Sequence, residues 1–124
     1  MKRHILFVED DLDTREVVQL LLRQEGFQVS VTGDSTEVLS LLASDHFDAL
    51  LLDNWMPKLN GIELCRLVRS SNINIPIFFC SGVVTDVDKK AALAAGAQGY
   101  FEKPIDPDEL AAILRAVLNP PNKV

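Results

Sequence analysis

Short apolar runs alternate with helical patterns five times along this chain, and the connections between them are short. The expected strands cover residues 5–8, 27–32, 49–52, 77–80 and 98–102. A continuous apolar run of this length is typical of a strand that is buried on both faces. Regular strand–helix alternation favours a parallel sheet covered by helices, with right-handed crossovers. The carboxyl ends of all strands would then lie at one edge of the sheet.

Capping signals place the helices between these strands. Asp13 is the expected N-cap of the first helix, with Glu16 three residues later completing a capping-box pattern. In the helix expected over residues 86–95, Leu93 is the expected main apolar contact. Asp106 followed by proline predicts the start of the last helix.

Composition limits the class of protein. The chain has 124 residues, 48% of them hydrophobic and 24% charged, as in one globular domain. A net charge of −6 argues against a sequence-independent nucleic-acid surface, which needs clustered cations. The longest apolar run is well below the ~20 residues that span a bilayer, and the N-terminus has no secretory pattern. We therefore expect a cytoplasmic protein, with Cys65 and Cys80 as buried thiols.

Charged and hydroxyl side chains follow the expected strands where the apolar runs end. Brought to one sheet edge, several carboxylates repel one another unless a cation neutralises them. Oxygen ligands without histidine or cysteine favour Mg²⁺. A lysine and a hydroxyl would suit a phosphoryl group bound to Asp53. The charged and hydroxyl side chains that follow the expected strands are those of Glu9, Asp10, Asp11, Asp53, Ser81 and Lys103. This set predicts phosphoryl transfer to Asp53 beside Mg²⁺.

Four segments, residues 8–11, 52–61, 80–82 and 99–104, occur in this order at the expected strand ends. Together they resemble the receiver domain of response regulators in two-component signal transduction, over residues 4 to about 118. The resemblance implies an α/β, doubly wound (βα)5 flavodoxin-like three-layer fold, with a five-stranded parallel sheet of order 2-1-3-4-5. It also implies a receiver domain over 1–119, with 120–124, including Pro120 and Pro121, as a C-terminal tail or the start of a linker.

The resemblance further implies a role for each residue of the site. Asp53 is the expected phosphoacceptor. The expected metal ligands are Glu9, Asp10, Asp53 and the main-chain carbonyl of Trp55. Ser81, Tyr100 and Lys103 are the expected phosphate-binding and switch residues, and the Lys103–Pro104 peptide bond is expected to be cis. Trp55 and Val83 flank the site, and we hypothesise that they slow attack of water on the acyl phosphate.

Partners and cofactor are implied in the same way. The cofactor would be Mg²⁺, with Mn²⁺ as an alternative, and the phosphodonor a sensor histidine kinase or a histidine phosphotransfer protein. A downstream output domain or protein would read a surface around Lys89, Lys90, Leu93 and Tyr100. We expect no direct nucleic-acid or membrane binding, and a monomer or a phosphorylation-linked dimer. Beyond its own phosphorylation and slow autodephosphorylation, the domain would not be an enzyme.

Three alternative classes of protein fit the sequence less well. A haloacid-dehalogenase-like phosphatase needs a second carboxylate two residues after the nucleophile, where this chain has Trp55. A receiver-like interaction module that is not regulated by phosphorylation would be favoured by loss of Asp10, Asp53 or Lys103, and all three are present. A flavodoxin-like electron carrier needs a phosphate-binding loop after the first strand, which is missing. His4 and His46 are interpreted as surface residues outside the site.

Overall fold

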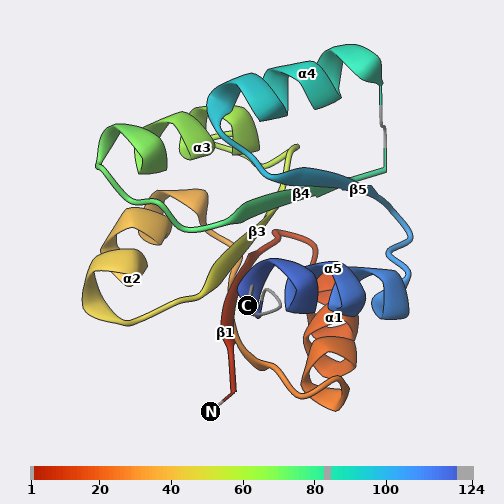
Figure 1. Cartoon of the computed structure of the whole chain (residues 1–124). Helices are drawn as coiled ribbons and strands as arrows, with labels where there is room; N and C mark the ends of the chain where they lie inside the picture. Colours follow the sequence, from red (N-terminus) through yellow and green to blue (C-terminus); the bar gives the residue numbers. More distant parts are fainter. Residues whose placement is uncertain (1, 83–84, 120–124) are drawn as a thin grey trace, which may run out of the picture.

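The computed structural model describes residues 2–82 and 85–119, and within them five parallel strands form one sheet. The strand order is β2-β1-β3-β4-β5, which confirms the predicted fold (Figure 1). The strands are β1 (His4–Val8), β2 (Gln28–Thr32), β3 (Ala49–Asp53), β4 (Ile77–Ser81) and β5 (Gly99–Glu102).

Helices cover both faces of this sheet (Figure 1). They are α1 (Leu12–Gln24), α2 (Val38–Ser44) after the 3-10 turn η1 (Ser35–Glu37), α3 (Gly61–Ser70), α4 (Asp86–Ala95) and α5 (Pro107–Leu118). One apolar core packs α2, α3 and α4 against the sheet, and a second packs α1 and α5 against the other face. Within the described residues, no helix is both long and apolar enough to cross a bilayer.

The central strand β3 contributes to both cores because its side chains alternate between the two faces. Leu50 and Leu52 belong to the core under α2, α3 and α4, and Leu51 belongs to the core under α1 and α5. All three have 0% exposure, and full burial of each contributes about 2 kcal/mol. The strand ends on Asp53, so a rigid, fully covered strand fixes the position of that carboxylate. Cys65 and Cys80 are buried free thiols, as predicted.

Two predictions about helices were wrong. Asp11, not Asp13, caps α1, because its carboxylate accepts the Thr14 N–H at 2.9 Å. The chain therefore turns into the helix directly after the acidic strand end. Leu93 is 55% exposed, whereas Ala92 is fully buried. Small residues at the contact let α4 approach the sheet closely, and Leu93 points away from it.

The interpretation of His4 as a surface residue was also wrong, because its exposure is only 6%. The ring nitrogens lie 2.9 Å from the His46 carbonyl oxygen and 2.7 Å from Ser30 Oγ. The ring also lies against Phe47, with centroids 4.2 Å apart. Burial is therefore compensated, since both polar atoms of the ring have partners. His46 is exposed, as predicted.

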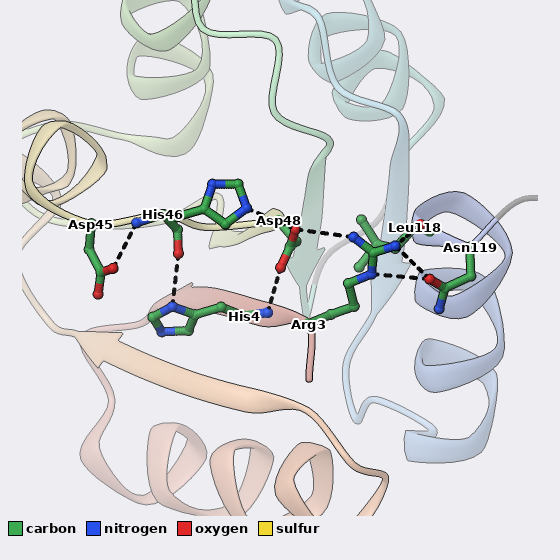
Figure 2. Close-up of polar contacts among 7 residues, drawn as sticks. All are labelled: Arg3, His4, Asp45, His46, Asp48, Leu118 and Asn119. Carbon is green, nitrogen blue, oxygen red and sulfur yellow. Dashed lines mark hydrogen bonds and ion pairs between the residues drawn. The ribbon is translucent and has the colours of Figure 1, made fainter. Parts of the chain in front are cut away.

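Asp48 organises the edge of the sheet where the strands begin (Figure 2). Its carboxylate accepts the His4 N–H at 2.8 Å and lies 3.4 Å from Arg3 Nη1. Burial alone would raise the pKa of Asp48, but these donors and His46 outweigh burial and lower it. Arg3 also donates to the Leu118 carbonyl at 2.9 Å and to Asn119 Oδ1 at 2.7 Å. The end of α5 is thereby held at this edge.

Candidate functional site

The opposite edge, where the strands end, collects the predicted site residues. Strand register pairs Asp53 of β3 with Cys80, so Ser81 follows directly beside the end of β3. The Lys103 N–H donates to the Ser81 carbonyl at 2.8 Å, which joins the ends of β4 and β5. Ser81 itself is fully buried. Parallel topology therefore brings residues from distant parts of the sequence to one place, as the strand pattern predicts.

Three carboxylates meet at this edge. Glu9, Asp10 and Asp53 each offer an oxygen, and these oxygens lie within 4.8 Å of one another. Glu9 and Asp53 are buried and Asp10 is exposed. Among the described residues, Glu9 Oε2 is a buried side-chain oxygen without a hydrogen-bond partner. A buried, unpartnered carboxylate oxygen beside two further carboxylates fits a hard divalent cation, which takes oxygen ligands.

Lys103 is the cation of the site. Its Nζ forms an ion pair with Glu9 Oε1 and lies 3.6 Å from Asp53 Oδ2. Burial would lower the pKa of Lys103, but the hydrogen bond to Glu9 and the negative charges raise it overall. For Glu9, burial and the neighbouring Asp53 outweigh Lys103 and raise the pKa to about 7. One lysine therefore does not neutralise all the acid in this site.

The loop after β3 is built closely around Asp53. Asp53 Oδ1 accepts the Trp55 N–H at 3.2 Å, while the Trp55 side chain is 61% exposed. Asn60 caps α3 through a reciprocal capping box with Glu63. A Cβ on Gly61 would lie 3.0 Å from the Asp53 carbonyl oxygen and from Asn54 Cα. Glycine therefore lets α3 start directly against the end of β3.

Asn54 is a site residue that sequence reasoning missed. Its side chain is only 4% exposed, and its Nδ2 donates to Tyr100 Oη at 3.3 Å. The half-buried Tyr100 ring stacks on Phe79, with centroids 5.7 Å apart. This contact links the residue after Asp53 to β5. The one signal in the sequence was a polar side chain directly after the carboxylate that ends an apolar run.

The structure describes some of the remaining predicted features, and others lie outside the described residues. The Lys103–Pro104 peptide bond is cis. Val83, expected beside Trp55, and the tail or linker expected over 120–124 lie outside the described residues. The Trp55 main chain lies in the loop beside the carboxylates, where its N–H donates to Asp53 Oδ1.

A groove of about 550 Å³ opens next to Lys103, between α1 and the segment that follows β5. Its lining is largely apolar and includes Val17, Leu21 and Ile105. Val17 is 56% exposed, and Leu12 and Leu20 of the same helix are exposed to a similar extent. The exposed Val17 side chain thus adds apolar surface to the groove beside Lys103.

Comparisons with known proteins agree on one family. The model of the response regulator receiver domain matches residues 5–115. Response regulator MprA of Mycobacterium bovis is 40% identical over 118 residues, and DNA-binding response regulator MtrA of Mycobacterium tuberculosis is 38% identical. Each alignment covers 95% of this chain and 51% of the relative, so the chain spans about half the length of these relatives.

Solved structures show the same fold. The receiver domain of Francisella response regulator 1452 superposes with a TM-score of 0.89 and 27% identity, covering 94% of this chain and 97% of that one. Chemotaxis protein CheY4 of Vibrio cholerae gives a TM-score of 0.88 and 29% identity, covering 95% of this chain and 100% of that chain.

Proposed function

Because this chain belongs to the response regulator receiver domain family, we propose that it accepts a phosphoryl group on Asp53 and changes its surface in response. The observation that carries the proposal is the buried Asp53 carboxylate, which lies beside the Glu9 and Asp10 carboxylates and 3.6 Å from the Lys103 ammonium. An aspartate that only capped a turn would need neither group.

In the proposed reaction, a carboxylate oxygen of Asp53 attacks the phosphorus of a phosphohistidine on the donor protein. The bond between phosphorus and the imidazole nitrogen breaks, its electron pair stays on that nitrogen, and Asp53 becomes an acyl phosphate. Glu9, Asp10, Asp53 and the Trp55 main-chain carbonyl would hold Mg²⁺, or Mn²⁺ in its place. The bound ion would supply positive charge opposite the phosphoryl oxygens.

Lys103 supplies the second counter-charge and couples the site to the surface. In the present state its ammonium contacts Glu9 and Asp53. A phosphoryl group on Asp53 adds acceptor oxygens that compete for this ammonium and for the Ser81 hydroxyl. Because the Lys103 main-chain N–H donates a hydrogen bond to the Ser81 carbonyl, a shift of either residue moves the ends of β4 and β5 together.

Tyr100 extends this coupling to the proposed output face, formed by α4, β5 and α5. Its hydroxyl already accepts a hydrogen bond from the side chain of Asn54, one residue after the proposed phosphoacceptor. Exposed Leu93, Lys89 and Lys90 lie on the α4 part of that face. A partner that binds this face better in the phosphorylated state would favour phosphorylation, by linkage.

The donor is proposed to be a sensor histidine kinase or a histidine phosphotransfer protein that docks on the groove beside α1. The groove adjoins Lys103 and presents exposed Val17, so an apolar helix of the donor could seat there with its phosphohistidine facing Asp53. Apart from its own phosphorylation and slow dephosphorylation, the domain catalyses no reaction in this proposal. Output would reside in a further domain or a separate protein.

Fluorescence of the single tryptophan tests the metal and phosphoryl sites together, because the Trp55 N–H contacts Asp53. Saturable quenching by Mg²⁺ is expected, with a further change when beryllofluoride is added as a phosphoryl mimic. Asp53→Asn should lose the second change. A beryllofluoride response that persists in Asp53→Asn would contradict the assignment of the acceptor.

A further inference from the structure

We propose that Arg15 is a positioning residue, which sets the orientation of the peptide bond between Glu9 and Asp10. The inference rests on the proposed function, in which these two residues hold the divalent cation. Arg15 touches neither carboxylate; it acts through the main chain that carries them.

The contact joins α1 to the end of β1. Arg15 Nη1 donates to the Glu9 main-chain carbonyl at 3.2 Å. On its other side, the Glu9 N–H donates to the Thr32 carbonyl at 3.0 Å. The sheet therefore holds one side of Glu9, and a side chain from α1 holds the other at the point where the strand ends.

This carbonyl belongs to the peptide plane that links Glu9 to Asp10. Its direction sets ψ of Glu9 and φ of Asp10, and hence where the Asp10 carboxylate lies relative to the buried Glu9 carboxylate. Asp10 itself is exposed, so little packing holds its side chain in place. A fixed peptide plane lowers the cost of bringing both carboxylates to one cation.

Gly33, in the turn after β2, makes room for the Arg15 guanidinium. A Cβ built there would overlap Arg15 Nη1, while Arg15 Cζ and the Glu9 carbonyl oxygen would both be 3.5 Å away, in ordinary contact. The φ angle of Gly33 is outside the left-handed region, so alanine is conformationally acceptable there. Gly33→Ala should therefore fold and displace only the tip of Arg15.

Two variants at different places in the chain then share one defect. In Arg15→Ala and in Gly33→Ala the Glu9 carbonyl loses the same donor. We expect the affinity for Mg²⁺ to fall about tenfold in each variant, which is the lower end of the range for loss of a residue that orients metal ligands. The double variant should bind Mg²⁺ no more weakly than Arg15→Ala alone, because the two changes remove one contact.

The direction of the effect separates positioning from simple electrostatics. Removing the positive charge of Arg15 near three carboxylates would by itself strengthen Mg²⁺ binding, and Gly33→Ala leaves the charge in place. Arg23→Ala is the matched control: Arg23 lies on the same helix and donates to the Val29 carbonyl of β2 at 3.4 Å, away from the site. That variant loses a similar bond and should keep the Mg²⁺ affinity of the wild type.

The experiment is a Mg²⁺ titration of the full chain and the four variants, followed by Trp55 fluorescence, together with the amide chemical shift of Asp10 in metal-free protein. Weaker Mg²⁺ binding and a displaced Asp10 amide signal in Arg15→Ala and Gly33→Ala, but not in Arg23→Ala, are expected. Wild-type affinity and an unmoved Asp10 signal in both would overturn the inference. If the wild type bound no Mg²⁺, the proposed function would fail, whereas the Asp10 signal would still report on the Arg15 contact.

Discussion

At the scale of single residues, the site contains more negative charge than its one lysine balances. Glu9 is fully buried, with one carboxylate oxygen paired to Lys103 and the other without a hydrogen-bond partner in the described part of the chain. Such a group is costly to ionise, and its raised pKa is the measure of that cost. Metal-free protein should therefore bear an electrostatic penalty that a divalent cation relieves.

The pH dependence of stability tests this penalty. The pKa of Glu9 rises from 4.5 to about 7 in the folded protein. Between these values the folded state retains a proton that the unfolded chain has released, so metal-free protein loses up to about 3 kcal/mol of stability as pH rises through this window. Urea unfolding in a chelator, compared at pH about 5 and about 8, measures the loss. Glu9→Gln should remove most of that difference; an equal difference in the variant would show that the penalty arises elsewhere than at Glu9.

At the scale of elements, α4 is held mainly at its C-terminal end. Its buried residues, Ala92 and Ala95, both lie in its second half. Arg69 of α3 donates to the Gly96 carbonyl at 2.8 and 3.1 Å and to the Ile73 carbonyl at 2.9 Å. Gly96 has a φ of 111°, and a Cβ there would collide with the Arg69 side chain. Both the backbone conformation and the close approach of Arg69 therefore require glycine at this position.

Arg69→Ala should destabilise the protein by about 2 kcal/mol, because the Gly96 and Ile73 carbonyl groups lose a charged donor at once. Urea unfolding measures the change in free energy. Arg66→Ala on the same helix is the control, since Arg66 is exposed, and its effect should stay within about 0.5 kcal/mol. Equal effects of the two substitutions would show that the contact with Gly96 contributes little.

The α1 face makes a separate prediction about the phosphodonor. Val17→Glu places a charge in the apolar groove beside Lys103 and should slow transfer from a histidine kinase by about tenfold or more, the cost of one good interface contact. Phosphorylation by acetyl phosphate should be unchanged, because a small donor needs no docking surface.

The control for this prediction is Leu67→Glu, an exposed apolar position on α3, on the other side of the sheet. Kinases from a purified panel would be ranked on the wild type, and the fastest one used for both variants. If Val17→Glu and Leu67→Glu slowed transfer equally, the donor would not dock on α1.

At the scale of the whole molecule, the sheet separates two polar edges with different roles. One edge holds the Asp48, Arg3 and His4 network, which fixes the end of α5. The other holds the carboxylates and Lys103. The parallel sheet and the edge that carries the site were predictable from the alternating pattern, because parallel crossovers leave few topologies. The strand order was predicted from the family resemblance alone.

Details that depend on packing were not predictable in the same way. The burial of His4 depends on partners from β2 and from the loop before β3, and Asn54 is defined by a contact with Tyr100 of β5. The choice of Asp11 over Asp13 as cap depends on where the chain leaves β1. For His4 and Asn54, residues close in space but distant in sequence decided the outcome, whereas the cap of α1 was decided by the point at which the chain leaves β1.

Chemical mapping of the phosphorylated residue tests the central claim most directly. The protein would be treated with acetyl phosphate and Mg²⁺, reduced with borohydride, which converts an aspartyl phosphate to homoserine, and digested for mass spectrometry. Phosphorylation of Asp53 predicts homoserine at position 53, dependent on Mg²⁺ and missing when the metal is chelated. Homoserine at Asp10 or Asp11 in place of Asp53, or an unmodified chain under these conditions, would contradict it.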